Sequence, residues 1–596
     1  MNHSTNDNHY IGLKNFLKNF NATSFILLVL LGVQLGYSLW ALNKGFDFTD
    51  EAHAYLGFDN PNEVTHVATY YAVFVSDIFG WIGINIVKIR ILRLLFIVLC
   101  GLIFAMGIST WLKRFGKLTN AQHTNLVLFI LLGSFLVNAT GSQSITYNLS
   151  TTFLLQFILG AILYLDQRDY KISAVDEAIF SIVGALLFVL FAIKFSVAIS
   201  VAGITVVLIF TTQKDIKTLA VHCISMLLGS LISGIVLFGS NLLVWVTNYT
   251  KTLTFVASLT VGSIASRYSE DFSYTLSSKI VSNLSAVIVV LGLLLVNSQS
   301  QKKIIKVASV IILTIVLIQL IVTHTYYLGG PKHYYLFTGL YIILVFILLV
   351  YEGTILFINR YRKQASETGE YKIVILLLLI PVIGAIGTNN LLSIQIIWYS
   401  SFLFGAIYIL LTRHDGFFLA SITMLIGVNA SVQAVSGLVH FPYRINKTLY
   451  EESVPIQKVG RGEPILVNKE TAKSLEQASS LIHLKTKYSS GDPIFSFSPD
   501  YYGFIYLLDG TLPGWGWYDE KGTELNCYNL NHSLCDLRKM IVLSPSYYQM
   551  DDSYLNCFDK LDINLNRDYE NLGTISYFMG DLDRSFSVYA PKQILK

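Results

Sequence analysis

Long apolar segments recur along most of this chain, and they constrain its fold more than any other feature. A helix of about 20 apolar residues crosses the hydrocarbon core of a bilayer. Segments of this kind fall at residues 24–42, 91–112, 123–139, 149–165, 178–193, 196–211, 219–246, 279–297, 304–322, 334–351, 373–388, 393–412 and 416–437. The chain is therefore expected to be a polytopic α-helical membrane protein with about 13 transmembrane helices.

Charge is scarce and unevenly divided. Charged residues make up 13% of the chain, whereas soluble proteins have about 25%, and this difference excludes a large soluble enzyme. Residues 441–596 hold 16 Lys/Arg and 20 Asp/Glu, a net charge of −4, which leaves residues 1–440 with +8. Short β-like runs and turn signals after residue 441 predict a small α+β domain. We therefore expect a transmembrane domain over 1–440 and a soluble domain over 441–596.

The Lys and Arg residues of the short loops predict the orientation. Cytoplasmic loops carry an excess of these residues, and alternate connections beginning with the N-terminal segment carry most of them here. With an odd number of helices, this places residues 441–596 outside the cell, with the chain in the inner (plasma) membrane. The long loops 43–90 and 248–278 then also lie outside, and loops of that length are usually functional.

Three cysteines lie in the expected outer domain. Cys527, Cys535 and Cys557 allow one disulfide and one spare thiol, and the sequence leaves the pairing open. No Cys/His spacing typical of a metal site is present in the sequence.

Acidic residues are concentrated in the first outer loop, 43–90. This loop holds a third of the carboxylates of residues 1–440, namely Asp47, Asp50, Glu51, Asp59, Glu63 and Asp77. The adjacent Asp50 and Glu51 follow a membrane span among aromatic residues, where burial and a like-charged neighbour raise a carboxylate pKa and suit it to proton abstraction. The alternative is structural: Thr49 or Asp50 caps a helix that begins at Glu51. The two interpretations are compatible.

Isolated cations lie at the expected outer face. Lys194 falls between two spans, Lys332 and His333 with Tyr335 precede the tenth span, and Arg267 lies in the second long loop. Cations near membrane depth on this side indicate an anionic partner such as a lipid phosphate. The alternative is that these side chains snorkel to the lipid headgroups.

Two further groups could contact a substrate. Tyr147 and Asn148, at the start of the fourth span, could hydrogen-bond a hydroxylated substrate, although aromatic residues are common at that depth. The segment Pro513-Gly514-Trp515-Gly516-Trp517-Tyr518 could stack on sugar rings, and a role in the domain core is at least as well supported.

This pattern resembles the GT-C class of integral membrane glycosyltransferases, in particular its protein O-mannosyltransferase and lipid A aminoarabinose transferase branch. The resemblance rests on the number of spans, the outer soluble domain and a set of short motifs. These motifs are Asp50-Glu51 with His53 and Tyr55, Lys194 at the outer hairpin, and Lys332-His333-Tyr334-Tyr335.

The resemblance implies a reaction and roles for these residues. A sugar, hexosyl or pentosyl, would pass from a polyprenyl-phosphate donor to a cell-surface glycan, lipid or protein acceptor, as in cell-envelope polysaccharide biosynthesis. No nucleic acid partner is expected. Asp50 would act as general base with Glu51 orienting it, while Lys194, Lys332 and His333 would neutralise the phosphate. The remaining substrate-binding candidates are His53, Tyr55, Tyr147, Asn148, Arg267 and Tyr335.

The sequence departs from this family in one respect. Several relatives carry a second acid in the next outer loop, whereas residues 138–150 here have none. This puts a divalent metal in doubt, although Asp50 and Glu51 could bind one with Asp47 or Glu270, and no cofactor is assigned.

Two alternatives belong to other functional classes. A transporter or flippase of polyprenyl-linked glycans would be expected to show internal repeats and ionisable residues at mid-membrane, and the spans carry few charges. A glycan polymerase or ligase would be expected to keep its key residues in a late outer loop rather than in the first.

Overall fold

The computed structural model describes residues 21–255 and 369–596, together with a few residues between these ranges. Short gaps within them fall at 65–68, 114–117, 170–171, 213–214, 388–391, 413, 415, 446, 459–460, 519–522, 547–551 and 580–581. The expected spans 279–297, 304–322 and 334–351 lie wholly or mostly outside the described residues, so the number of 13 stays a prediction.

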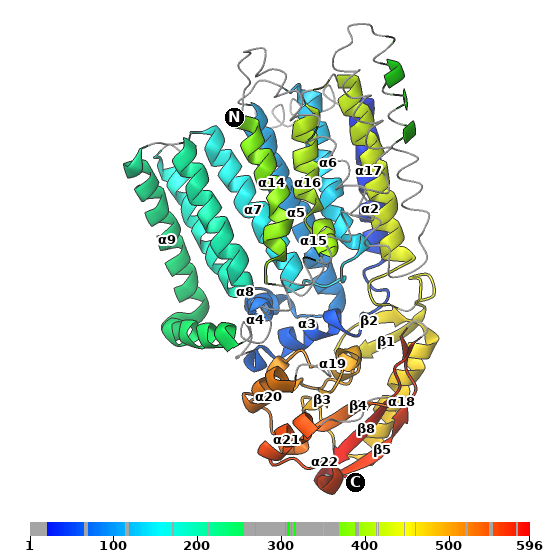
Figure 1. The fold of residues 1–596 in the computed structure, drawn as a ribbon. Coiled ribbons are helices and arrows are strands. Elements are labelled where there is room, and N and C mark those ends of the chain that lie inside the picture. The colour runs from blue at the N-terminus through cyan, green and yellow to red at the C-terminus, as the bar shows by residue number, and fades with distance from the viewer. Residues whose placement is uncertain are drawn as a thin grey trace, which may run out of the picture.

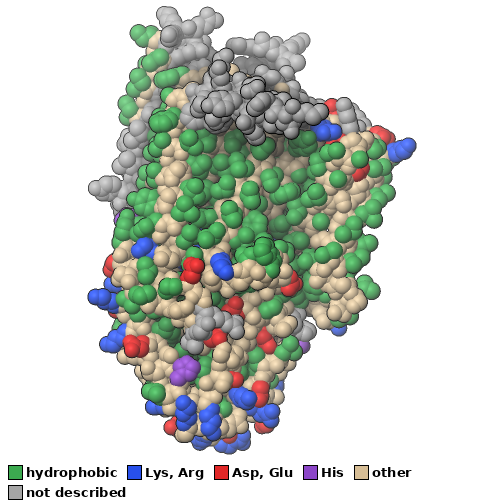
Figure 2. All heavy atoms as spheres, turned by 180° about the vertical axis from the view of Figure 1, so that it is seen from behind, with side chains coloured by type: hydrophobic (Ala, Val, Ile, Leu, Met, Phe, Trp, Pro, Cys, Tyr) green, Lys and Arg blue, Asp and Glu red, His purple; other side chains and the backbone are tan. Residues whose placement is uncertain are grey.

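The described part up to residue 439 is a bundle of helices (Figure 1). Its α-helices are α2 (Ala22–Trp40), α3 (Asp50–Asp59), α4 (Tyr71–Phe79), α5 (Ile86–Lys113), α6 (Asn120–Phe135), α7 (Tyr147–Gln167), α8 (Ala174–Thr212), α9 (Ile216–Phe238), α14 (Gly369–Ala385), α15 (Leu392–Trp398), α16 (Ser400–Leu411) and α17 (Gly416–Val439). Seven helices among the described residues are long and apolar enough to cross a bilayer, and the chain is a polytopic α-helical membrane protein. Figure 2 shows a broad apolar band over the helices, with many charged side chains beyond its lower edge and a few at its upper edge.

Helix α8 is a hairpin. It runs for 39 residues, and Lys194 has non-helical dihedral angles (φ −155°, ψ 83°) near its middle. Asp176, near its start, pairs with Arg168 at 3.0 Å, and Thr212, at its end, donates to Asp166 at 3.0 Å. Both ends of α8 therefore lie beside the end of α7, and the chain turns back at Lys194. This confirms the two separate segments expected at 178–193 and 196–211.

The segment expected to span at 393–412 is interrupted. It forms α15 and α16, which meet at Tyr399, rather than one continuous helix. The Tyr399 side chain is fully buried, and Gly384 of α14 lies so close that an added Cβ would be 2.3 Å from its ring. The apolar pattern misses this break because the residues around Tyr399, 397–401, include neither proline nor glycine.

The described strands all lie after residue 453. They are β1 (Val454–Lys458), β2 (Arg461–Val467), β3 (Ile494–Ser496), β4 (Ile541–Pro545), β5 (Tyr569–Ile575), β6 (Phe578–Met579), β7 (Leu582–Asp583) and β8 (Phe586–Pro591). The main sheet has the order β3-β4-β8-β5, in which β3 and β4 are parallel and the other pairs antiparallel. The helices of this part are α18 (Lys469–Lys485), α19 (Tyr502–Leu507), α20 (Thr523–Asn531), α21 (Asp552–Lys560) and α22 (Leu565–Asp568).

The first outer loop shares a hydrophobic core with the C-terminal part. Phe46 and Phe48 of the loop belong to the same buried cluster as Phe504 and Phe586, and a separate cluster fills the interior between the membrane helices. Backbone bonds join the segment after α2 to β2: Gly45 donates to Leu466 at 2.8 Å, and Leu466 donates to Asn43 at 2.7 Å. Loop 43–90 is therefore a packed layer between the helices and the sheet (Figure 1).

Candidate active site

Asp47 organises the start of α3. Its carboxylate accepts hydrogen bonds from the backbone N–H and hydroxyl of Thr49, at 2.9 and 2.6 Å, and from the backbone N–H of Glu51, at 3.1 Å. The helix begins at Asp50, and the side chain of Thr49 makes no capping bond. Thr49 thus occupies the N-cap position, one of the two expected alternatives, while the Asp47 carboxylate accepts the backbone N–H bonds at the start of the helix.

Asp50 is held from a distant part of the sequence. The Tyr443 hydroxyl donates to its Oδ2 at 2.5 Å, and Nη1 of Arg444 lies 3.4 Å from its Oδ1. Burial, together with Asp50 itself, raises the pKa of Tyr443 well above its ordinary value, so the phenol remains a donor. The Asp50 side chain is 28% exposed. Each of its oxygens is oriented, and the carboxylate remains reachable.

Arg444 has an unusual backbone. Its φ of 52° lies in the left-handed region, which non-glycine residues adopt at a cost and which is over-represented at functional sites. Its guanidinium also donates to the Thr49 hydroxyl at 2.7 Å. The strained turn after α17 thus brings two side chains onto the start of α3.

Glu51 is fully engaged in the interior. It forms a two-pronged ion pair with Arg90 of α5, with both N–O distances at 2.8 Å, and both side chains are 1% exposed. Arg90 also donates to the backbone carbonyls of Leu42, Lys44 and Gly45 at 2.7–3.0 Å. The predicted role of Glu51 in orienting Asp50 is untested, and the contacts found place it as an anchor of the loop.

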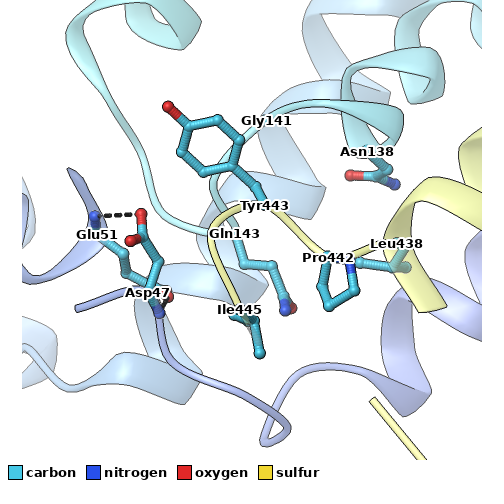
Figure 3. Close-up of a pocket in the computed structure, with 9 residues that line it drawn as sticks. All are labelled: Asp47, Glu51, Asn138, Gly141, Gln143, Leu438, Pro442, Tyr443 and Ile445. Carbon is cyan, nitrogen blue, oxygen red and sulfur yellow. Dashed lines mark hydrogen bonds between the residues drawn. The ribbon is translucent and has the colours of Figure 1, made fainter. Parts of the chain in front are cut away.

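Asp47 has an altered acidity. Burial, and then the charge of Asp50, raises its pKa to about 7, against the opposing effects of Arg444 and the Thr49 hydrogen bonds. Asp47 and Glu51 line a small pocket with Tyr443, while Asn138 and Gln143 contribute from the next outer loop (Figure 3). The loop at residues 138–150, which has no acidic residue, thus supplies two amide side chains to this pocket.

His53 and Tyr55 face the protein interior. His53 stacks on Trp515, with ring centroids 4.4 Å apart, and burial lowers its pKa to about 4. Trp515 donates from its indole to the His53 carbonyl at 2.8 Å, which gives this part of the aromatic segment 513–518 the expected core role. Tyr55 is fully buried and donates to the Ile86 carbonyl at 3.1 Å. No observation tests the proposed binding roles of His53 and Tyr55.

Three of the predicted residues converge at the corner of α8. The Lys194 ammonium donates to the side chain of Asn148 at 3.4 Å and to the Gly384 carbonyl, and it lies 5.8 Å from the centroid of the Tyr147 ring. Lys194 is only 5% exposed. None of these partners is a carboxylate, so this buried ammonium contacts no counter-ion within the part of the chain that the structure describes.

Tyr71 of α4 connects this corner with Asp50. Its ring centroid lies 6.3 Å from that of Tyr147 and 5.7 Å from that of Trp515. Burial raises the pKa of Tyr71 well above its ordinary value, and the charges of Asp50 and Tyr147 add to this effect. Asp50 and the Lys194 corner are therefore parts of one region.

Several residues lie outside this arrangement. Lys332, His333, Tyr335 and Arg267 are not among the described residues. Glu63 is buried and accepts bonds from Gly514, Ser533 and Leu534 at 2.6–3.0 Å, and Asp59 pairs with Lys458. These two acids therefore tie the loop to the C-terminal part.

The described residues contain no group of three His, Cys, Asp or Glu side chains that could hold a metal ion. A divalent metal at Asp50 and Glu51 stays a prediction. The carboxylates nearest the site are engaged by Tyr443, Arg444 and Thr49. Glu270, the other predicted ligand, lies outside the described residues.

Comparison with known proteins gives structural matches alone. No protein-family model matches the sequence, and no curated protein matches it. The chain is similar to two crystal structures of ArnT from Cupriavidus metallidurans. The structure bound to undecaprenyl phosphate shares 11% identity with a TM-score of 0.42, and the apo structure shares 12% with a TM-score of 0.40. Each match covers 96% of this chain and 98% of the other.

Proposed function

We propose that this protein is a membrane glycosyltransferase that transfers a sugar from a polyprenyl-phosphate donor to an acceptor hydroxyl at the outer face of the membrane. One observation carries the proposal: a reachable, oriented carboxylate, Asp50, shares a region with a buried ammonium, Lys194, at the end of a bundle of apolar helices. A donor with a polyprenyl tail can remain in lipid while its phosphate reaches that region.

The arrangement suits both parts of a displacement reaction, the deprotonation of the acceptor and the departure of the phosphate. Asp50 takes the proton of the acceptor hydroxyl, whose oxygen attacks the anomeric carbon of the donor. The bond from that carbon to the phosphate oxygen breaks, and the electron pair leaves with the polyprenyl phosphate. Lys194 stabilises the charge that develops on the phosphate. Tyr443 and Arg444 keep the carboxylate in one orientation, which favours a productive approach.

The disulfide supports an outer location for the C-terminal part. Cys527 pairs with Cys557, and Cys535 is free. Structural disulfides form and persist in oxidising compartments and are rare in the cytosol. This agrees with the orientation expected from the charged loops, in which the protein lies in the inner membrane with residues 441–596 extracytoplasmic.

The test is a transfer assay with the purified full-length protein in nanodiscs. Synthetic polyprenyl-phosphate pentoses and hexoses serve as donors, envelope glycolipid and glycan extracts serve as acceptors, and release of polyprenyl phosphate is measured. We expect Asp50→Asn to fold and to lose about 10²- to 10⁴-fold in rate, the usual contribution of a positioned general base.

Asp77→Asn is the matched control, because it removes a carboxylate from the same loop at an exposed position outside the site. It should retain the wild-type rate. Full activity of Asp50→Asn would refute the role of Asp50. Vesicle flux of a polyprenyl-linked glycan without any transfer would favour a transporter instead.

A further inference from the structure

The C-terminal part has a basic end in an otherwise acidic domain. Four short segments, which we call the basic end, carry much of its positive charge: residues 483–487, 536–539, 567–568 and 592–596. They contain seven Lys or Arg residues and two Asp residues, whereas the rest of residues 441–596 contains 9 Lys/Arg and 18 Asp/Glu. The two signs of charge are therefore separated within one domain.

The fold brings these four segments together around residues 592–596. The Lys487 N–H donates to a carbonyl of this segment at 2.7 Å, and side chains of the segment donate to the carbonyls of Arg538 and Arg567 at 2.5 and 2.7 Å. All seven Lys and Arg side chains of the basic end are exposed. In Figure 1 the C-terminus and α22 lie at the end of the molecule away from the membrane helices, and Figure 2 shows Lys and Arg side chains gathered at that end.

Most of these cations have no acidic partner. Within the basic end, Arg538 pairs with Asp536 at 3.2 Å and Arg567 pairs with Asp568 at 2.7 Å. The other five cations form no ion pair with a described residue, and they are Lys485, Lys487, Lys539, Lys592 and Lys596. Like charges gathered in one place repel one another, which is a cost to the folded state. A partner of opposite charge removes this cost.

The arrangement of the lysines favours a polymer as that partner. A lysine is a compact point charge on a flexible stem, without the fork of arginine that grips one anion. A chain with repeated negative charges meets several lysines at once, and its release of counter-ions drives binding. The membrane that holds the helices lies at the other end of the molecule (Figure 1). In the outer location proposed for residues 441–596, the polyanions at hand are glycans rather than nucleic acids.

We propose that the basic end binds an acidic polysaccharide of the cell envelope, a chain that carries a carboxylate or a phosphate in its repeating unit. The lysine ammonium groups contact successive acidic groups along the polymer. This surface is remote from Asp50, so it holds a polymer near the protein without taking part in sugar transfer. The proposal rests on the outer location and on the envelope-glycan substrates of the proposed function.

The experiment measures polymer binding by the full-length protein in nanodiscs of zwitterionic lipid. Fluorescently labelled polygalacturonate and poly(glycerol phosphate) serve as the carboxylate and phosphate probes, and dextran of the same length is the neutral control. Binding is followed by fluorescence anisotropy. We expect at least one acidic polymer to bind and dextran not to bind. The dissociation constant should rise about tenfold or more from about 50 to about 200 mM salt, because several charges are neutralised together.

Two double variants with the same change in charge separate the basic end from the rest of the domain. Lys487→Glu with Lys539→Glu reverses two exposed lysines that make no side-chain hydrogen bond within the described residues, and it should weaken binding about tenfold or more. Lys469→Glu with Lys473→Glu is the matched control, since it reverses two exposed lysines at the opposite end of α18. This control should bind within about twofold of wild type. The thermal unfolding midpoint of each variant shows that it is folded.

Each outcome decides for or against the proposal. Binding of polygalacturonate alone or of poly(glycerol phosphate) alone identifies the acidic group that is recognised. The proposal is overturned if neither acidic polymer binds, if dextran binds equally well, or if the two double variants lose affinity equally. Salt-dependent self-association without polymer would assign the basic end to a second copy of the chain instead. Asp50→Asn should bind as wild type does, so failure here is distinguishable from failure of the proposed function.

Discussion

The acids of the first outer loop fall into two groups that sequence alone does not separate. Glu51, Asp59 and Glu63 tie the loop to α5 and to the C-terminal part through ion pairs and backbone N–H groups. Asp47 and Asp50 lie instead around the strained turn after α17, where one carboxylate has a raised pKa and the other is reachable. A concentration of carboxylates can therefore serve the packing of the loop as well as catalysis. The contacts of each acid show which of these two roles it has.

Breaking the Glu51–Arg90 pair should have the largest effect on stability. Removing one partner of a buried ion pair leaves an uncompensated charge and typically costs about 3–5 kcal/mol. We expect Glu51→Gln and Arg90→Met each to lower the free energy of unfolding by about this amount, measured by chemical denaturation in detergent. Wild-type stability in both variants would contradict the anchoring role.

Glu63→Ala should have the next largest effect. It leaves the buried N–H group of Gly514 without an acceptor, a loss that costs about 1–3 kcal/mol. It also removes the acceptor of the partly buried N–H group of Leu534. The change should also loosen the C-terminal part, so limited proteolysis within residues 513–535 should accelerate. Unchanged cleavage would show that Glu63 does not hold the two parts together.

Asp47 should give the protein a pH-dependent stability. Its folded-state pKa is raised to about 7 from an ordinary value of 3.8, so the folded protein holds a proton that the unfolded chain has lost. Stability should therefore be highest below about pH 4 for this group and fall by up to about 1.4 kcal/mol per pH unit as pH rises toward 7. Unfolding measured across this range in wild type and Asp47→Asn should show a shallower fall in the variant. Equal slopes would contradict the assignment.

Asp50→Asn should have the smallest effect on stability. The side chain is partly exposed, and the amide oxygen can still accept from Tyr443, so the change should stay within about 1 kcal/mol. The same variant is expected to lose transfer activity. A large loss of stability would place Asp50 with the anchoring acids and remove the distinction between the two groups.

The features that sequence predicts here are local ones. Apolar segments locate the long described helices of the bundle, although they miss the break at Tyr399. Lys194, which lies between two such segments, forms the hairpin corner, where it meets Tyr147 and Asn148. Tyr443, Arg444 and Arg90 were missed as site residues. Tyr443 meets Asp50 across 393 positions of the sequence, and Arg90 lies beside an apolar run that gives no sign of its carboxylate partner. Only the fold creates these pairs.

The shared core of the first loop and the C-terminal part has a consequence for biosynthesis. Glu63 meets Gly514 and Ser533 across 451 and 470 positions of the chain. Membrane insertion proceeds from the N-terminus, so this loop is made long before its packing partners have been translated. Until those partners are made, the aromatic side chains of the loop stay uncovered, and a chain in this state is prone to aggregate. A nascent chain truncated before residue 441 would already have its membrane helices and would lack an assembled Asp50 site.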